Sequence, residues 1–168
     1  KSASWYRNAV SLIADRSSPS ELFASGKMLG RPSAGRMSMF FYDPKFKQRL
    51  PYYDIFPLVL PLETAKGGFI GLNFHYLPYG ARFAFLQQLQ SFASNKKFDQ
   101  STKIQATYQQ VKSNKYVKAS IKRYLYSQVR SNFLRIDVNE MALAAYLPVA
   151  QFQGATLGTV FARSRKTY

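Results

Sequence analysis

The clearest chemistry in the sequence lies in a stretch where cations alternate with tyrosines. Lysines and arginines recur from Lys96 to Arg135, and Asp99 is the one acid among them. Such a surface can neutralise several phosphates and displace their condensed counterions. A tyrosine in it can stack on an exposed base or hydrogen-bond a phosphate oxygen. We therefore predict DNA contacts from eight residues: Lys96, Lys97, Lys112, Lys115, Lys118, Lys122, Arg123 and Arg130.

An ordinary surface helix is the alternative interpretation of the same stretch. At helical spacing Lys115, Lys118 and Lys122 share roughly one side with Arg130. A solvated helix face with half-buried tyrosines has this pattern without any ligand. The ratio of ten bases to one acid between Lys96 and Arg135 favours an anionic partner.

Catalysis has little support in the residue types. The chain has one histidine, His75, and no cysteine, which excludes disulfides, thiolate zinc sites and cysteine nucleophiles. His75 is predicted to be a structural residue at the end of a strand. The glycine-rich segment from Gly26 to Arg36 lacks the residue order of a phosphate-binding loop.

The carboxylates are too sparse to gather around a divalent metal ion. Asp43 adjoins a proline and Asp54 lies between two, so both indicate turns. Asp137 and Glu140 have the spacing of a helix capping box. We predict that the protein is not an enzyme and takes no cofactor, metal or small-molecule substrate; a nuclease is the less favoured reading.

The overall charge leads to the same class of partner. The 168 residues include 24 Lys and Arg against 8 Asp and Glu, for a formal net charge of +16. A charge of this size is tolerable when an anionic partner screens it. Nucleic acid is the first candidate, and an anionic membrane or an acidic protein is the second. The longest apolar stretch, residues 55–62, is short and contains two prolines, so no membrane partner is predicted.

Two parts of the chain are predicted to position these residues. Residues 1–35 form a short helix over 2–14 and an extended basic arm, Gly26 to Gly35, whose composition cannot build a core. The arm is expected to lie against another subunit or DNA. Residues 36–168 form the main domain.

The main domain begins with strands. Apolar runs predict strands at Arg36–Tyr42, Leu58–Glu63 and Phe69–Tyr76, and Lys66-Gly67-Gly68 predicts a hairpin turn between the last two. The proline-bounded segment Pro51–Pro57 is expected at an edge or in a structured loop. In the third strand, alternation predicts one core face, made of Ile70, Leu72, Phe74 and Tyr76.

Helices are predicted to follow and flank these strands. Hydrophobic spacing indicates helices from about Gly80 to Phe92, at 103–111, at 121–130, at 139–146 and within 151–168, with a strand at 133–138. The predicted fold class is α+β: a small antiparallel β unit, of which a small open barrel is one form, followed and flanked by helices.

Three segments, Met39–Leu62, Gly67–Leu77 and Ile121–Arg130, carry a resemblance to a known family. They are similar to a virion protein family of large contractile-tailed (T-even-type) bacteriophages, often labelled DNA end protector proteins. The resemblance runs from about Trp5 to the C-terminus.

The resemblance implies a virion protein that binds the end of packaged phage DNA and shields it from host exonuclease. It implies phage DNA and other virion proteins as partners, and a homo-oligomer within the particle. No residue carries over as catalytic. A purely structural neck, tail or baseplate component is the alternative.

Overall fold

The computed structural model of the chain describes residues 27–32, 36–93, 117–136, 144–145 and 150–166. The predicted helices at 2–14 and 103–111 lie outside these ranges, as does most of the one at 139–146. Four of the predicted DNA contacts also lie outside them: Lys96, Lys97, Lys112 and Lys115.

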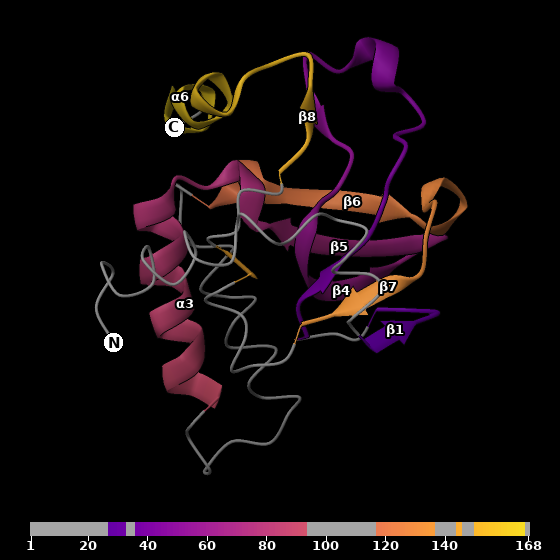
Figure 1. Cartoon of the computed structure of the whole chain (residues 1–168), viewed down its shortest axis with the longest axis horizontal. Coiled ribbons are helices and arrows are strands. Elements are labelled where there is room, and N and C mark those ends of the chain that lie inside the picture. Colours follow the sequence, from indigo (N-terminus) through magenta and orange to yellow (C-terminus); the bar gives the residue numbers. More distant parts are fainter. Residues whose placement is uncertain (1–26, 33–35, 94–116, 137–143, 146–149, 167–168) are drawn as a thin grey trace.

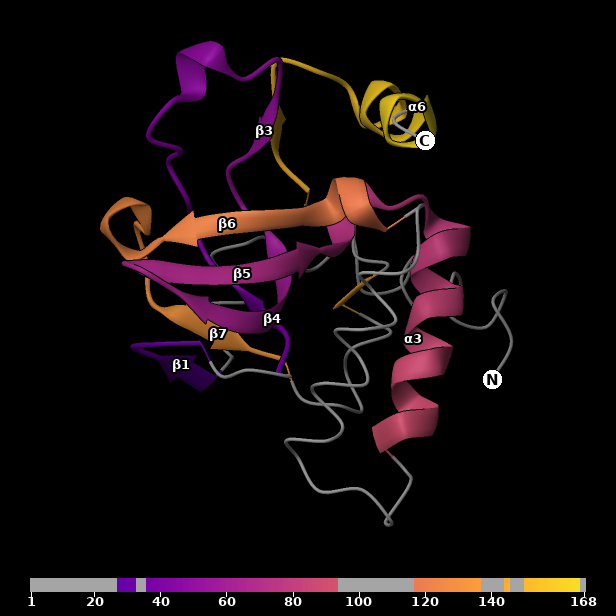
Figure 2. The ribbon, with the colours of Figure 1, turned by 180° about the vertical axis from the view of Figure 1, so that it is seen from behind.

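A six-stranded antiparallel sheet forms the centre of the fold, as Figures 1 and 2 show. Its strands, in spatial order, are β1 (Lys27–Leu29), β7 (Phe133–Arg135), β2 (Ser38–Met39), β4 (Leu58–Ala65), β5 (Gly68–Asn73) and β6 (Ile121–Leu125). The sheet is open, with β1 and β6 as its edges. The α+β class predicted from the sequence is confirmed.

The predicted hairpin is confirmed as the pair β4 and β5, although its second strand ends at Asn73 and not at the predicted Tyr76. Its turn residue Gly67 has φ +71°, a backbone conformation that glycine adopts without a Cβ penalty. At Gly68 a Cβ atom would collide with the backbone carbonyl of Tyr124 on β6, so only glycine allows the close approach of the third strand. The register shifts between Pro61 and Glu63, an irregularity next to a residue that cannot donate to the ladder.

The sheet buries both of its faces, so the prediction of a single core face on the third strand was incomplete. Leu72 and Phe74 join the main core, which includes Phe85 and Leu86 of helix α3 (Tyr79–Ala93). Phe69, on the opposite face, belongs to an aromatic cluster of buried side chains. That cluster consists of Phe40, Tyr42, Val59, Phe69, Tyr124 and Phe133.

The predicted helix over 121–130 is wrong. Residues 121–125 are strand β6, which pairs with β5 from Gly68↔Leu125 to Leu72↔Ile121, and residues 126–128 form the 3₁₀ turn η4 (Tyr126–Gln128). The alternation of a strand explains why Tyr124 packs on Phe69, with ring centres 5.4 Å apart, while Arg123 is exposed. The open edge of β5 therefore overrode the helical spacing of the segment.

The basic arm is extended at β1, as predicted, but it packs on its own chain. Lys27, Met28 and Leu29 pair with β7 of the central sheet. The other side of β1 is an open edge of the sheet, so the predicted contact of the arm with another subunit or DNA stays a prediction. The division of the chain at residue 35 stays a prediction, because residues 1–26 lie outside the described ranges.

A second, two-stranded sheet joins β3 (Tyr53–Asp54) to β8 (Phe152–Gln153). This pairing confirms an edge position for the proline-bounded segment. The last helix, α6 (Leu157–Lys166), lies within the predicted range 151–168. It begins only at Leu157 because strand β8 comes first and Gly154 takes φ +87°. Three further 3₁₀ turns are η1 (Lys47–Arg49), η2 (Phe74–Tyr76) and η3 (Lys118–Ser120). Helix α3 confirms the prediction from Gly80 onward.

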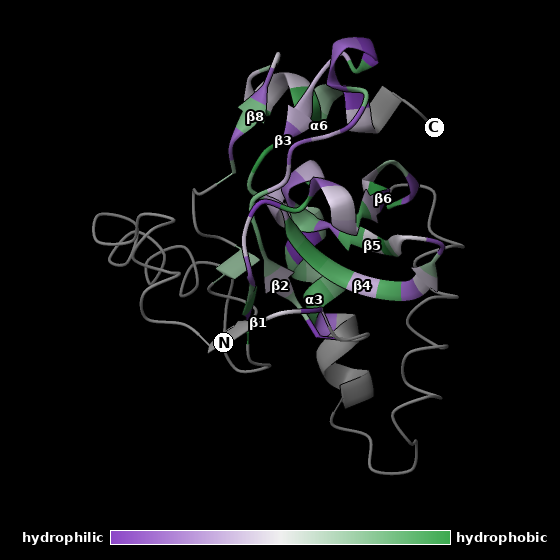
Figure 3. Ribbon diagram, turned by 90° about the vertical axis from the view of Figure 1, so that its right-hand side faces the viewer, coloured by the Kyte–Doolittle hydropathy of each residue, from purple (hydrophilic) through white to green (hydrophobic). Residues whose placement is uncertain are grey.

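Hydropathy follows this architecture. Figure 3 shows β4 and β5 as largely hydrophobic, whereas the loop that carries η1, at the top of the view, is hydrophilic. Among the described helices, none is long and apolar enough to cross a membrane.

Candidate nucleic-acid interface

The four described residues of the predicted DNA site are spread along β6 and do not share a helix side. Lys118 lies in η3 before the strand, and Arg130 lies beyond η4 after it. The five residues of β6 alone span about 17 Å at 3.3 Å per residue. Lys118 and Arg130 therefore lie beyond opposite ends of β6, and the shared helix side predicted for them was wrong.

Lys122 is turned onto its own chain. Its Nζ lies 4.3 Å from the centre of the Tyr76 ring, a cation–π contact, and its side chain is half-buried. Burial lowers the pKa of Lys122 below its ordinary value. A lysine held in this way has less of its charge available to a phosphate than an exposed one.

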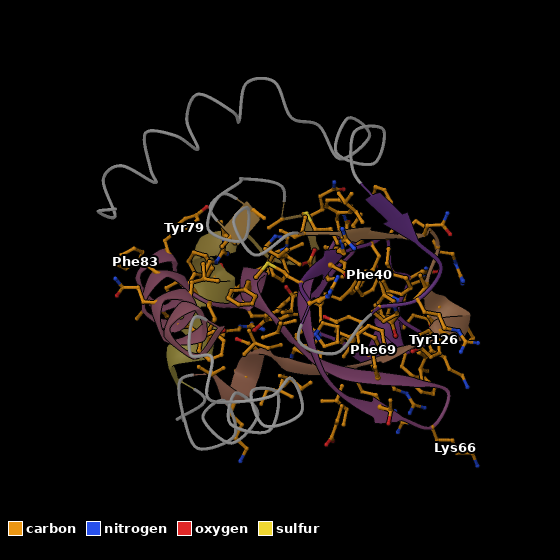
Figure 4. The ribbon with its side chains drawn as sticks, turned by 90° about the horizontal axis from the view of Figure 1, so that it is seen from below. Phe40, Lys66, Phe69, Tyr79, Phe83 and Tyr126 are labelled. Atoms are coloured by element: carbon orange, nitrogen blue, oxygen red, sulfur yellow. The ribbon has the colours of Figure 1, made fainter. Side chains whose placement is uncertain are left out.

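Arg123 is exposed at the hairpin end of the sheet. One of its guanidinium nitrogens donates to the backbone carbonyl of Lys66, 2.8 Å away, and thereby ties β6 to the turn between β4 and β5. Nearby, the N–H of Tyr126 donates to the carbonyl of Gly67 at 2.9 Å. Figure 4 shows Lys66 and Tyr126 at this outer end, with Phe69 and Phe40 further inside.

Arg130 is joined to a second basic segment by Asp43. Its guanidinium lies 3.8 Å from one carboxylate oxygen of Asp43, whose other oxygen accepts a 2.9 Å hydrogen bond from Lys47. This hydrogen bond raises the pKa of Lys47. The backbones are also paired: Asp43 N–H donates to Gln128 O at 3.0 Å and Arg130 N–H to Phe41 O at 2.8 Å.

The loop after Asp43 contains residues that the sequence reasoning did not place in the site. Phe46 is 58% exposed, and its ring centre lies 5.4 Å from Lys45 Nζ and 5.7 Å from Arg49 Cζ. We call Lys45, Phe46, Lys47, Arg49 and Arg130 the basic–aromatic rim. The signal for it was present in the alternation of Lys45-Phe46-Lys47, which the longer basic stretch overshadowed.

The exposed apolar side chains lie in the rim, directly after it in the chain, and in the turn η4. Within the described ranges, the large hydrophobic residues that are exposed are Phe46, Leu50 at 44% and Tyr126 at 40%. The rim has four cations and its neighbour Asp43 one negative charge, which leaves an excess of three positive charges. Exposed rings beside uncompensated cations are suited to bases and phosphates.

A second polar cluster lies inside the protein. Asp54 is buried and accepts hydrogen bonds from His75 Nδ1 at 2.7 Å, Asn73 Nδ2 at 3.1 Å and the Phe56 N–H at 3.0 Å. Burial acts to raise the pKa of Asp54, but the charge of His75 and these hydrogen bonds outweigh it and lower the pKa. Asp54 ends strand β3, and its bond from the Phe56 N–H, two residues on, is the local contact of the predicted turn role. The sequence reasoning missed its burial and its bonds to His75 and Asn73.

The buried cluster has the features of a structural element. His75 is completely buried, and its Nε2 has no hydrogen-bond partner among the described residues. The structural role predicted for this histidine agrees with that position. In the part of the chain that the structure describes, no group of three or more acidic or histidine side chains could hold a metal ion.

Taken together, the fold and the rim define a small basic α+β protein whose outer surface suits a polyanion. The chain belongs to the phage T4 terminal DNA protecting protein family, whose model matches residues 2–165. The family resemblance predicted from the sequence is thus confirmed, and the protein is a bacteriophage protein of a DNA-protecting family. No curated protein and no solved structure matches the chain.

Proposed function

We propose that the protein binds the end of linear phage DNA as a component of the virion and shields that end from exonuclease. It does so as a non-enzymatic cover. The observation that carries this proposal is that the described exposed apolar side chains, Phe46, Leu50 and Tyr126, all lie in segments with an excess of positive charge. The family to which the chain belongs is named for protecting terminal DNA, which supports it.

The rim explains how such binding is stabilised. Each phosphate that the cations neutralise releases condensed counterions, and the binding free energy gained in this way falls as the salt concentration rises. The hydrogen bonds that join the 43–49 loop to residues 127–130 hold the charges of two distant chain segments on one support. Lys118 and Arg123 remain proposed contacts, and Lys122 is the weakest of the described four for the reason given above.

A protection assay tests the proposal. A linear duplex of a few hundred base pairs is incubated with the full chain and then with an exonuclease that digests only from duplex ends. We expect digestion to be delayed at about 50 mM salt and the delay to shrink steeply toward 200 mM. A relaxed circle of the same sequence, added as competitor, should displace the protein poorly.

Two results would contradict this function. One is digestion at the same rate with and without protein at low salt. The other is equal competition by the circle and the linear duplex, which would show binding without recognition of the end.

The virion role has its own test. DNA–protein and protein–protein cross-linking in purified particles should join the chain to packaged DNA, to other virion proteins and to further copies of itself. Cross-links to protein alone would favour the purely structural neck, tail or baseplate role over DNA protection.

A further inference from the structure

The loop that carries Phe46 is tied down and holds its ring outward. At its base, Tyr42 N–H donates to Ile55 O at 3.0 Å and Asp43 N–H to Gln128 O at 3.0 Å. At its tip, Arg49 N–H donates to Phe46 O at 2.9 Å, and Lys47 bonds Asp43. Figure 1 shows this loop with η1 extending beyond the sheets at the top of the molecule.

The surroundings of the ring are those of a nucleic-acid contact. Lys45 and Arg49 both lie within 6 Å of the ring centre of Phe46, and Leu50 adds a second exposed apolar side chain beside them. A single exposed hydrophobic residue is ordinary on a protein surface. An exposed ring with two cations within 6 Å, on a loop fixed by hydrogen bonds, has the chemistry of base stacking combined with phosphate contact.

Geometry decides which part of a DNA molecule such a ring can reach. Every base pair inside a duplex is stacked on both faces, so its π-surface is covered. The terminal base pair has one uncovered face, and the phosphates of its strands lie at the edges of that face. An exposed ring with cations near it therefore matches a duplex end and does not match the middle of a helix.

Resting on the proposed function, we propose that Phe46 stacks on the uncovered face of the terminal base pair of duplex DNA, with Lys45 and Arg49 on the phosphates beside it. Stacking does not depend on which base is present, so this mode recognises an end without reading a sequence. The cations supply affinity for any DNA, and the ring supplies the preference for the end.

Paired binding measurements on the full chain test the proposal. The probes are a blunt linear duplex and a relaxed closed circle, titrated with wild type, Phe46→Ala and, as matched control, Gln48→Ala, which changes an exposed residue of the same loop. Base–aromatic stacking of about 1–3 kcal/mol corresponds to roughly a 5- to 150-fold loss of affinity. We expect Phe46→Ala to show this loss on the linear duplex and little change on the circle, and Gln48→Ala to keep the preference for the end.

A spectroscopic measurement reports stacking directly. The fluorescence of 2-aminopurine placed in the terminal base pair should change on binding wild type, and the change should be absent with Phe46→Ala. The same base at the centre of the duplex should show no change with either protein. Because Phe46 is exposed, the thermal unfolding midpoint of the Phe46→Ala variant is expected to match that of wild type. The Phe46→Leu variant keeps an apolar side chain without a ring, and it gives a second check that the ring itself is required.

Different outcomes separate this inference from the function on which it rests. The stacking role is overturned if Phe46→Ala binds the linear duplex as tightly as wild type does, or if its affinity falls equally for linear and circular DNA. In either case, end protection by wild type still stands. Wild type that shows no preference for linear DNA overturns the proposed function itself. The double variant with Lys45→Gln and Arg49→Gln should bind both probes more weakly, and the slope of log K against log[salt] should be shallower by about 1.8.

Discussion

The buried cluster around Asp54 and the exposed basic–aromatic rim use the same residue types for opposite purposes. Inside, Asp54 is satisfied by its own chain, and buried Arg82 donates to the carbonyls of His75, Leu77 and Ala145 at 2.7–3.1 Å. The ring of Tyr79 lies 4.6 Å from the Arg82 guanidinium. In the rim, four cations share one acid. Charges that the chain itself neutralises stabilise the fold, and charges that it leaves over are available to a partner.

The largest expected effect is on the buried side of this comparison. Asp54→Ala removes the acceptor of His75 and Asn73 and leaves both buried, which should lower the free energy of unfolding by about 3–5 kcal/mol. Urea denaturation measures the change. Asp43→Ala, which removes an exposed acid with two cationic neighbours, is the matched control and should alter the midpoint only slightly. Similar losses in the two variants would erase the proposed difference between the regions.

Arg82 should have the next largest effect. In Arg82→Met the hydrophobic stem is largely retained, but three carbonyls lose a donor in a buried site, so we expect a loss of about 3 kcal/mol. Arg123→Met removes a guanidinium that also bonds a carbonyl, but at the surface. Chemical denaturation of both variants should therefore separate them clearly; an Arg82 variant as stable as the Arg123 variant contradicts the prediction.

The pH dependence of stability sharpens the comparison further. The pKa of Asp54 is lower in the folded protein than its ordinary value of about 3.9, so between these two values the unfolded chain binds more protons. The stability due to Asp54 is present above pH 4 and is lost as the pH falls through the folded pKa. Unfolding free energies measured from pH 5 to pH 2 should fall less steeply in Asp54→Asn. A variant profile parallel to wild type would show that other acids carry the acid sensitivity.

The smallest effect on stability is expected in the rim. The substitutions Lys45→Gln, Arg49→Gln and Arg130→Gln should each change the free energy of unfolding by no more than about 0.5 kcal/mol, since single surface substitutions rarely do more. The triple variant that combines them should bind DNA more weakly, with a salt slope shallower by up to about 2.7. Lys122→Gln, whose side chain lies on Tyr76, is the one-charge control and should alter the slope less per charge removed. A larger effect from Lys122 would return it to the centre of the DNA site.

The sequence by itself determined the features that depend on neighbours along the chain. The Gly67-Gly68 turn between two apolar runs specifies the β4–β5 hairpin, because the turn conformation and the strand propensity are both local. The stripe from Phe83 to Phe92 specifies helix α3 in the same way. The family and the strongly basic character are also properties of the chain as written.

Only the tertiary structure decided the features that depend on residues far apart in sequence. Residues 121–125 fit either period, and pairing with β5 made them a strand. The turn contact of Asp54 with Phe56 is local, but its partners Asn73 and His75 lie 19 and 21 positions further along the chain, and no local pattern indicates them. The loop that carries Phe46 is joined at Phe41 and Asp43 to the segment of Gln128 and Arg130, more than 80 residues further along the chain, and no local pattern encodes that pairing.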